Sequence, residues 1–342
     1  MNLSDTDATA LMSQVTTQKP LLTGSTDYKT FMLYLSKLNI NQAVNLDDPN
    51  DDYNQLEIAN STVENANNIA GTQNRQVGIA QENGNDTNGD GYNANKVTLT
   101  NTATGSINLT GDESTGIYAK RGLIFNDGQI SVGKKSTGIY IVEDDRSPVG
   151  AVAGARAINS STGVITIGED STGMYYKVDP DNADGRGTNT AIGGGIVNDG
   201  KIESTANNVI AMSFDSPYAS KTMENSATGV IDLQGQNSTG MFATGAGTYT
   251  AVNNGTIKLA SSSNVNTPNI GMYTDKDTIT LENNGTIEGG DKTVGIYGYN
   301  ANLGATSTTK VGSGGTGVYS KGGNVTINGG TLSVGENGTT GS

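Results

Sequence analysis

The stretch STGIYAKRGLIFNDGQISVGKKSTGIY, from Ser114 to Tyr140, contains the tripeptide Gly-Ile-Tyr twice, at Gly116–Tyr118 and at Gly138–Tyr140. The second copy begins 22 residues after the first. Repetition at a fixed interval of about 20–50 residues is typical of solenoid and propeller folds, in which each repeat offers the same surface to its neighbour. This stretch therefore predicts that one short strand recurs in successive structural units.

Two sequence blocks recur along most of the chain. The first block is Gly-(Ile/Met/Val)-aromatic, with a weak early copy in VGIA at 77–80. The second block places a Gly-x-Ile sequence after small or amide residues, as in NDGQISV from Asn126. The first block begins at Gly116, Gly138, Gly173, Gly240, Gly271, Gly295 and Gly317, and the second begins at residues 103, 126, 161, 198, 227, 253 and 283, with a variant at 328.

A third short strand, such as KVTLTN or RGLIFND, often precedes the second block. Within each segment apolar residues alternate with polar ones, as in Ile107/Leu109 and Ile130/Val132, and this period of two indicates strands with one buried face. Three short strands per unit with Gly and Asn at the corners, where positive φ is accessible, predict an all-β fold. We expect residues 46–342 to form a right-handed parallel β-helix of about ten coils, about 50 Å long. A β-sandwich or propeller is the alternative, but a propeller blade needs about 40 residues.

Residues 1–45 have a different pattern. SDTDATALMSQV has a helix start signal at Ser4 and apolar residues at helical spacing. STDYKTFMLYLSKLN then places Tyr28, Phe31, Leu35 and Leu38 on one helical stripe. Two amphipathic helices before a solenoid predict a cap, which covers the unpaired strands of the first coil.

Composition excludes several kinds of site. The 342 residues include no cysteine and no histidine, so disulfides, zinc–thiolate sites and Ser-His-Asp triads are excluded. The net charge of −14 and pI near 4.3 argue against binding to nucleic acid or to anionic lipid. The segment after Met1 does not resemble a signal peptide, and the C-terminal GGTLSVGENGTTGS resembles an interrupted repeat. We interpret the chain as a fragment of a longer protein.

The intervals between repeats are uneven, and the longer ones are expected to carry inserts. In solenoids, inserts lie on the lateral surface, where binding usually occurs. The expected inserts are Ile141–Ser160, Tyr176–Ile192, Met212–Met223, Thr244–Thr250, Ser261–Asn269 and Tyr299–Lys310.

The interleaved blocks STGIYA, NNGTIEGGDKTVGIYG and STGVITIGEDSTGMYY resemble the passenger repeats of the large type V autotransporter adhesins of fusobacteria, the RadD-like outer-membrane proteins. The resemblance covers about residues 95–340, and TDYKTFMLYLSKLNINQAV resembles the start of such a passenger. It implies a surface-exposed β-helical passenger that is exported and anchored by a C-terminal β-barrel, and that attaches bacteria to each other and to host cells. It transfers no short binding motif to individual residues.

An aromatic stripe is the first candidate binding surface. If Ile117, Ile139 and Ile296 point inward, the aromatic residues that follow them point outward by alternation. Such a stripe could stack on sugar rings or anchor a partner protein, although stacking that stabilises the ladder between coils is the simpler interpretation. Its members are Tyr118, Tyr140, Tyr175, Phe242, Tyr273, Tyr297 and Tyr319.

A candidate calcium loop lies in NDTNGDGYN, where Asp86, Asn88 and Asp90 match the first ligand positions of an EF-hand loop. The twelfth position is Val97 instead of the glutamate that a complete loop requires, so a solvated turn is the competing interpretation.

The acidic segment VEDDRSPVG is the third candidate, with Asp144, Asp145 and Arg146 as residues that could contact a ligand. Paired carboxylates on a β-helix could also serve glycoside hydrolysis, but adjacent carboxylates on one loop rarely have the separation that this reaction needs. A solvated acidic turn is the simpler interpretation of the segment. DPDNADGRG, at 179–187, allows the same alternatives.

Three classes of function remain open: an adhesive region, a structural spacer and a carbohydrate-active enzyme. Irregular inserts favour adhesion, because a spacer would be monotonous, and no column of acid/base residues on adjacent coils supports an enzyme. We expect a monomeric cell-surface adhesin passenger that is not an enzyme and contributes to virulence. Its expected partners are a host-cell receptor or glycan and the surface of other bacteria. We expect no nucleic-acid binding, no membrane insertion by this chain, and no cofactor other than the candidate calcium.

Overall fold

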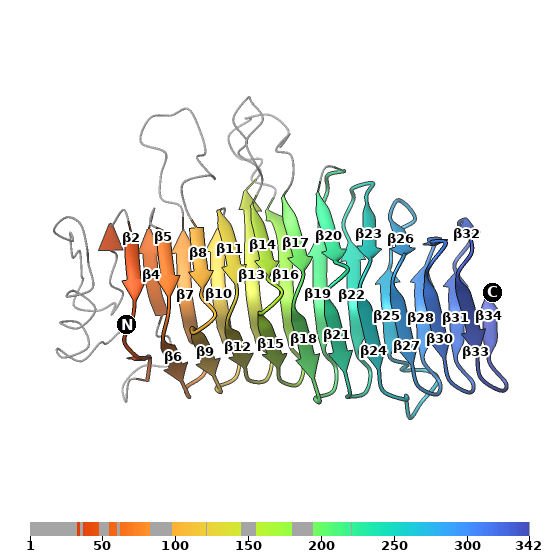
Figure 1. Cartoon of the computed structure of the whole chain (residues 1–342), viewed down its shortest axis with the longest axis horizontal. Coiled ribbons are helices and arrows are strands. Elements are labelled where there is room, and N and C mark those ends of the chain that lie inside the picture. Colours follow the sequence, from red (N-terminus) through yellow and green to blue (C-terminus); the bar gives the residue numbers. More distant parts are fainter. Residues whose placement is uncertain are drawn as a thin grey trace.

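The computed structural model of this protein describes residues 33–34, 37–47, 55–59, 62–82, 98–120, 122–144, 155–179, 194–219 and 221–341. In these ranges all regular structure is β-strand, and the strands form three parallel sheets of 12, 11 and 11 strands (Figure 1). The predicted parallel β-helix is confirmed. The described ranges contain no apolar helix long enough to cross a membrane.

Each sheet takes every third strand of the chain. The first sheet contains β1 (Leu33–Tyr34), β4 (Gln55–Ala59), β7 (Val77–Glu82), β10 (Thr115–Lys120), β13 (Thr137–Asp144), β16 (Thr172–Asp179), β19 (Ile210–Asp215), β22 (Thr239–Thr244), β25 (Ile270–Thr274), β28 (Val294–Gly298), β31 (Thr316–Ser320) and β34 (Thr339–Gly341). The second sheet contains β2 (Lys37–Ile40), β5 (Thr62–Asn65), β8 (Thr98–Asn101), β11 (Leu123–Asn126), β14 (Arg156–Asn159), β17 (Gly195–Asn198), β20 (Thr222–Asn225), β23 (Thr250–Asn253), β26 (Thr280–Asn283), β29 (Asn300–Leu303) and β32 (Val325–Ile327). The third sheet contains β3 (Val44–Asn45), β6 (Asn68–Gly71), β9 (Ser106–Leu109), β12 (Gln129–Val132), β15 (Val164–Ile167), β18 (Lys201–Ser204), β21 (Val230–Leu233), β24 (Thr256–Leu259), β27 (Thr286–Gly289), β30 (Thr308–Val311) and β33 (Thr331–Val334).

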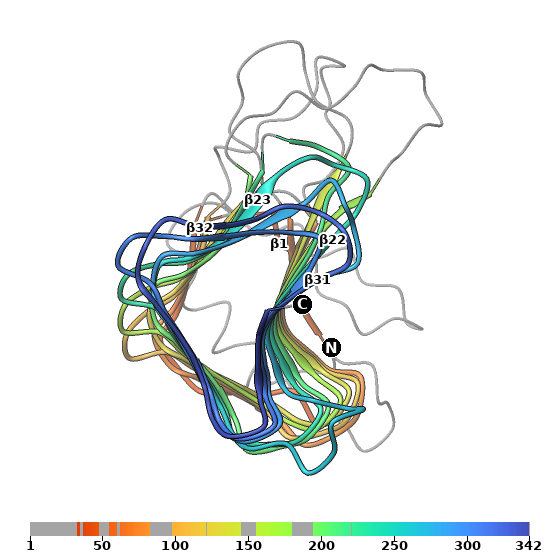
Figure 2. The same cartoon turned by 90° about the vertical axis from the view of Figure 1, so that its right-hand side faces the viewer.

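The helix is right-handed. Seen from its C-terminal end, the chain passes up the first sheet, across the upper corner, down the second sheet and back through the third (Figure 2). This path is counterclockwise while the chain advances toward the viewer, which defines a right-handed turn. The repeated tripeptide lies in register between coils, because Ile117 pairs with Ile139 and Tyr118 pairs with Tyr140.

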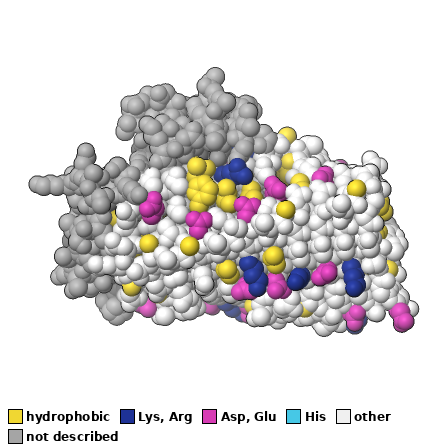
Figure 3. Space-filling view, in the orientation of Figure 1, with side chains coloured by type: hydrophobic (Ala, Val, Ile, Leu, Met, Phe, Trp, Pro, Cys, Tyr) yellow, Lys and Arg dark blue, Asp and Glu magenta, His cyan; other side chains and the backbone are white. Residues whose placement is uncertain are grey.

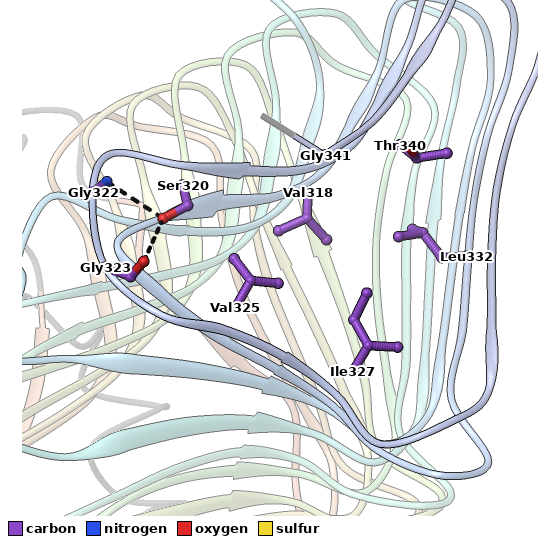
Figure 4. A pocket seen from close by; sticks show the side chains of 9 residues that line it. All are labelled: Val318, Ser320, Gly322, Gly323, Val325, Ile327, Leu332, Thr340 and Gly341. Carbon is purple, nitrogen blue, oxygen red and sulfur yellow. Dashed lines mark hydrogen bonds between the residues drawn. The ribbon is translucent and has the colours of Figure 1, made fainter.

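Inward-facing side chains stack in columns and make the core. Every first-sheet strand from β10 onward that carries a Gly-apolar-aromatic block buries the apolar residue, as Ile117, Ile139 and Ile296 do at 0% exposure. Full burial of an aliphatic side chain stabilises a fold by about 1.5–3 kcal/mol. At the C-terminal coil the column is uncovered, and Val318, Val325, Ile327 and Leu332 surround a hollow of about 600 Å³ (Figure 4).

Close approach of neighbouring coils explains the glycine of the Gly-Ile-Tyr block. A β-carbon on Gly138 would lie 2.6 Å from the carbonyl oxygen of Gly173 and 2.7 Å from Cγ2 of Ile165. The corner between the third and first sheets needs positive φ, but there the chain mostly uses residues other than glycine. The left-handed residues at this corner are Arg75, Glu113, Lys135, Asp170, Asn208, Asn237, Lys292 and Asn337. The expectation that Gly and Asn supply positive φ at the corners is therefore too narrow.

A ladder of buried asparagines runs along the end of the second sheet. Each side-chain amide except the last donates to Oδ1 of the asparagine one coil on, at 2.7–2.9 Å, and the last, Asn283, donates to Oγ1 of Thr309 at 3.1 Å. Every member is 0% exposed. The ladder begins after Ile40 in β2 and stops where Leu303 occupies the same position in β29. In the described coils its members are Asn65, Asn101, Asn126, Asn159, Asn198, Asn225, Asn253 and Asn283.

The helical cap predicted for residues 1–45 is wrong at its C-terminal end, where β1, β2 and β3 form strands of the β-helix. Leu38 and Ile40 are buried and pair in register with Val63 and Asn65. Pairing with the next coil outweighs the helical spacing of a short apolar run, which cannot distinguish helix from strand. Residues 1–32 lie outside the described residues.

Candidate functional site

The longest intervals between strands converge on one corner of the coil. Residues 83–97, 145–155 and 180–194 each connect a first-sheet strand to the following second-sheet strand. The strand ends that flank them lie at the same upper corner (Figure 2). The segment 260–269 instead connects β24 of the third sheet to β25 of the first. The insert expected at Tyr299–Lys310 is not one, since β29 and the first residues of β30 occupy it.

Beneath this corner lies a buried polar cluster made by Glu143, Tyr176 and Lys221. The Lys221 ammonium lies 2.6 Å from Oε1 of Glu143, and the two side chains are 0% and 1% exposed. The hydroxyl of Tyr176 donates to the other carboxylate oxygen of Glu143. The three residues come from β13, β16 and the residue before β20, so the cluster ties together strands from three coils.

Aromatic rings pack against this cluster from the C-terminal side. The Phe214 ring stacks on Tyr176 at 4.5 Å between centroids, and Tyr249 meets Phe214 edge-on at 5.1 Å. The Tyr249 hydroxyl donates to the carbonyl of Thr244 at 2.6 Å. Burial raises the pKa of Tyr249 well above its usual range, and the nearby Asp215 adds to this effect. The cluster is thus bordered by aromatic rings on this side, and within it the Glu143 carboxylate faces the Lys221 ammonium.

The interpretation of VEDDRSPVG as a solvated acidic turn is wrong for its first acidic residue, Glu143. Glu143 is buried and ion-paired instead of solvated. Asp144 ends β13, where its backbone pairs with that of Asp179. Asp145 and Arg146 lie outside the described residues, so their predicted ligand contacts stay predictions.

The predicted aromatic stripe forms a single column on the outside of the first sheet. The strands pair in register at Tyr118, Tyr140 and Tyr175, and again from Phe242 through Tyr273, Tyr297 and Tyr319. Centroids of successive rings lie 4.8–5.5 Å apart. The column therefore confirms the predicted direction of these side chains, which are partly exposed along its length.

The column is interrupted once, and its ring orientation changes twice, first between Tyr118 and Tyr140, whose planes are inclined by 59°. Ser213 of β19 occupies the position between Tyr175 and Phe242, so no ring bridges them. Farther along, the planes of Tyr273 and Tyr297 are inclined by 63°, although Phe242–Tyr273 and Tyr297–Tyr319 are stacked within 15°. Both the faces and the edges of tyrosine rings therefore line this side of the molecule.

The outer surface of the third sheet has a different character. A row of alternating charges lies along it, toward the lower edge of the view in Figure 3. Lys201 pairs with Glu203 on its own strand and with Asp232 on the next at 3.9 Å. The row continues through Lys258, Glu288 and Lys310. On the third sheet, charges of opposite sign lie next to one another. On the first sheet, the aromatic column exposes apolar surface instead.

Alkaline titration tests the environment of Tyr175. Burial raises the pKa of Tyr175 to about 12, and Tyr140 and Asp215 act in the same direction. Because this value lies above the ordinary 10.0, the contribution of Tyr175 to stability is complete below pH 10 and is lost as the pH rises toward 12. We expect the phenolate absorbance lost in Tyr175→Phe to titrate with a midpoint near 12. A midpoint near 10 would instead show a solvated hydroxyl.

The candidate calcium ligands Asp86, Asn88 and Asp90 lie outside the described residues, so the calcium site stays a prediction. Within the described ranges no group of three or more acidic side chains could hold a metal ion. Comparisons with known protein families, with curated proteins and with solved structures find no match to this chain.

The sequence analysis does not predict the asparagine ladder or the Glu143–Lys221 pair, for different reasons. The asparagine ladder has a signal, since Asn ends a short strand and Gly follows two to four residues later in almost every repeat. The same spacing also fits Asn and Gly at a turn, so by itself it does not predict the ladder. The Glu143–Lys221 pair joins residues 78 apart in the chain and has no sequence signal, because intervals of uneven length separate its members.

Proposed function

We propose that this chain is the adhesive region of a surface-exposed β-helical passenger of the autotransporter type, attaching to host cells or to other bacteria. The observation that carries the proposal is the aromatic column, which places partly exposed rings from successive coils on one face of a rigid rod. Tyrosines are favoured in binding surfaces because they offer large contact area and a hydroxyl at low entropic cost. The passenger role and surface location come from the repeat resemblance.

The column alone would also suit a spacer, in which stacked rings merely stabilise adjacent coils. Two details favour binding. The rings adopt different orientations along the column, and the face next to it carries the segment 260–269, which pure stacking does not require. An enzyme would need carboxylates facing an open cleft, whereas Glu143 is enclosed in an ion pair. We therefore place adhesion first and the spacer second.

The test is direct binding of the purified, labelled chain to epithelial cells, immune cells and partner bacteria. Saturable binding is expected, and Tyr140→Ser combined with Tyr297→Ser should weaken it by about tenfold, since a few aromatic residues usually dominate an interface. The matched control is Lys258→Ser with Lys310→Ser on the third sheet, which should bind as the unmodified chain does. Adding EDTA examines the candidate calcium loop in the same assay.

A folded, β-rich sample that binds none of these surfaces would contradict the adhesive function and leave a spacer. Equal losses in the column variant and in the third-sheet control would show that the aromatic column is not the contact surface. Loss of binding in EDTA, restored by calcium, would support the metal site at Asp86, Asn88 and Asp90.

A further inference from the structure

The first sheet is not flat but indented along its length. In its strands the outward residues, such as Thr316 and Tyr319, are separated by two consecutive buried residues instead of one. This pattern bends each strand at the Gly-apolar pair, and the end-on view shows the resulting inward step on the first-sheet side (Figure 2). The bend recurs in the strands that carry the Gly-apolar-aromatic block, so the backbone of the first sheet is indented along its length, and toward the C-terminal end a groove lies over this indentation.

Near the C-terminal third, the segment 260–269 adds a second wall to this groove. The walls enclose a volume of about 500 Å³ between the exposed Val265 and Asn266 on one side and the tyrosine column on the other. The three rings that face it belong to Tyr273, Tyr297 and Tyr319. They come from successive coils, so the groove extends along the rod and not across it.

Buried hydrogen bonds hold the second wall in place. Asn269, at 0% exposure, accepts from the backbone amide of Ser238 at 2.8 Å and donates to the carbonyls of Gly235 and Ala260 at 2.9 and 3.0 Å. The backbone amide of Ser262 also donates to the carbonyl of Asp291 at 2.8 Å. Both ends of the segment are therefore fixed to neighbouring coils, which lowers the entropy lost when a ligand enters.

The residues that line the groove are uncharged, although the chain contains 34 acidic and 20 basic residues. The Lys321 ammonium lies outside this lining, 5.1 Å from the centroid of the Tyr297 ring. The lining combines tyrosine rings with the hydroxyls of threonines and the amides of Asn237 and Asn266. Rings in two orientations can meet the apolar C–H faces of sugars, and the hydroxyls and amides can both donate and accept hydrogen bonds. A net charge of −14 disfavours anionic glycans, because a polyanion would be repelled over long range.

From this chemistry we infer that the groove between segment 260–269 and Tyr273–Tyr297–Tyr319 binds a neutral oligosaccharide that lies along the rod axis. The inference rests on the proposed adhesive function, to which it assigns a ligand class. The apolar C–H groups of the sugars contact the exposed edges of the tyrosine rings, whose faces largely pack against neighbouring rings. The sugar hydroxyls bond to Thr239, Asn266 and the tyrosine hydroxyls. An extended chain fits better than a single sugar, since equivalent positions repeat from coil to coil.

The test is binding of the full chain to an array of neutral, sialylated and sulfated oligosaccharides, followed by calorimetry with the neutral glycan that binds best. Neutral glycans should bind and charged ones should not. Tyr297→Ala is expected to weaken binding by about tenfold or more, because it removes the central ring of the groove. Tyr299→Ala is the matched control, since it removes a partly exposed tyrosine that belongs neither to the aromatic column nor to the groove lining. Circular dichroism of both variants checks that each remains folded.

Cell binding measured on the same variants separates this inference from the proposed function. If no neutral glycan binds while the chain still binds cells, the groove assignment is wrong and adhesion stands. If a glycan binds but Tyr297→Ala and Tyr299→Ala behave alike, the groove is not the glycan site. If protease treatment of the cells abolishes binding and no glycan binds, the ligand of the groove is a protein and the glycan assignment is wrong. Absence of both glycan and cell binding overturns both proposals.

Discussion

Replacing Lys221 by methionine is expected to lower the free energy of unfolding by about 3–5 kcal/mol, because it leaves the buried carboxylate of Glu143 without its counter-charge. The two side chains are 0% and 1% exposed, so water cannot take the place of the ammonium. Tyr176 donates a single hydrogen bond to the carboxylate and cannot neutralise it. The effect is measured as a shift in the midpoint of urea unfolding followed by circular dichroism.

A second variant separates the cost of an unpaired charge from the loss of packing. Glu143→Leu, Tyr176→Phe and Lys221→Met together remove both charges and the hydroxyl, and they leave apolar groups of similar volume. Most of the lost stability should return, since a buried ion pair replaced by packed apolar side chains is often neutral or better. If the triple variant is no more stable than Lys221→Met, lost packing and not the unpaired charge explains the effect.

Lys134→Met is the matched surface control. Lys134 pairs with Glu169 at 2.5 Å, but the two side chains are 42% and 41% exposed. Exposed pairs of this kind contribute little, because water solvates whichever charge is left behind. A midpoint for Lys221→Met equal to that of Lys134→Met would mean that the Glu143 site is open to solvent.

Those parts of the fold that depend on a pattern within a single strand could be predicted from the sequence. Alternation in segments such as Gln129–Val132 predicts which side chains face the core, and the repeated Gly-Ile-Tyr block predicts the first sheet and the outward direction of its rings. Both predictions depend only on the period of two and on repetition. The interruption at Ser213 has no signal in the sequence, because β19 lacks the Gly-apolar-aromatic block and the position of Ser213 in the column follows only from the pairing of β19 with β16 and β22.

Features that depend on register between distant coils could not be predicted in this way. The intervals 145–155 and 180–194 separate Glu143 from Lys221 in the chain, so the meeting of the two side chains depends on register between coils. The groove similarly needs segment 260–269 to face rings that follow it in the chain, Tyr273 and Tyr297. Near the N-terminus, Leu38 fits a helical stripe and a strand equally well, and only its pairing with Val63 decides between them.

The asparagine ladder offers the second large effect, and Asn253→Ala is the variant that tests it. The side-chain amide of Asn253 donates to Asn283 at 2.8 Å, and its oxygen accepts from Asn225 at 2.8 Å. Alanine would leave the Asn225 amide and the Asn283 oxygen without these partners in a site that is 0% exposed. A buried unsatisfied polar group costs about 1–3 kcal/mol, so we expect a loss of roughly 2–5 kcal/mol.

The adjacent Asn254 provides a control of the same residue type at the same corner. Asn254 points outward, donating to Glu224 at 2.8 Å and accepting from Asn284 at 3.0 Å, and it is only partly buried. Water can replace these bonds, so Asn254→Ala should lower stability by less than about 1 kcal/mol. If the ladder acts as a continuous network, Asn253→Ala and Asn225→Ala together should cost less than the sum of the two single changes, because both remove the bond between them. Additive losses would show that each asparagine acts only through its bonds to the backbone of the next coil.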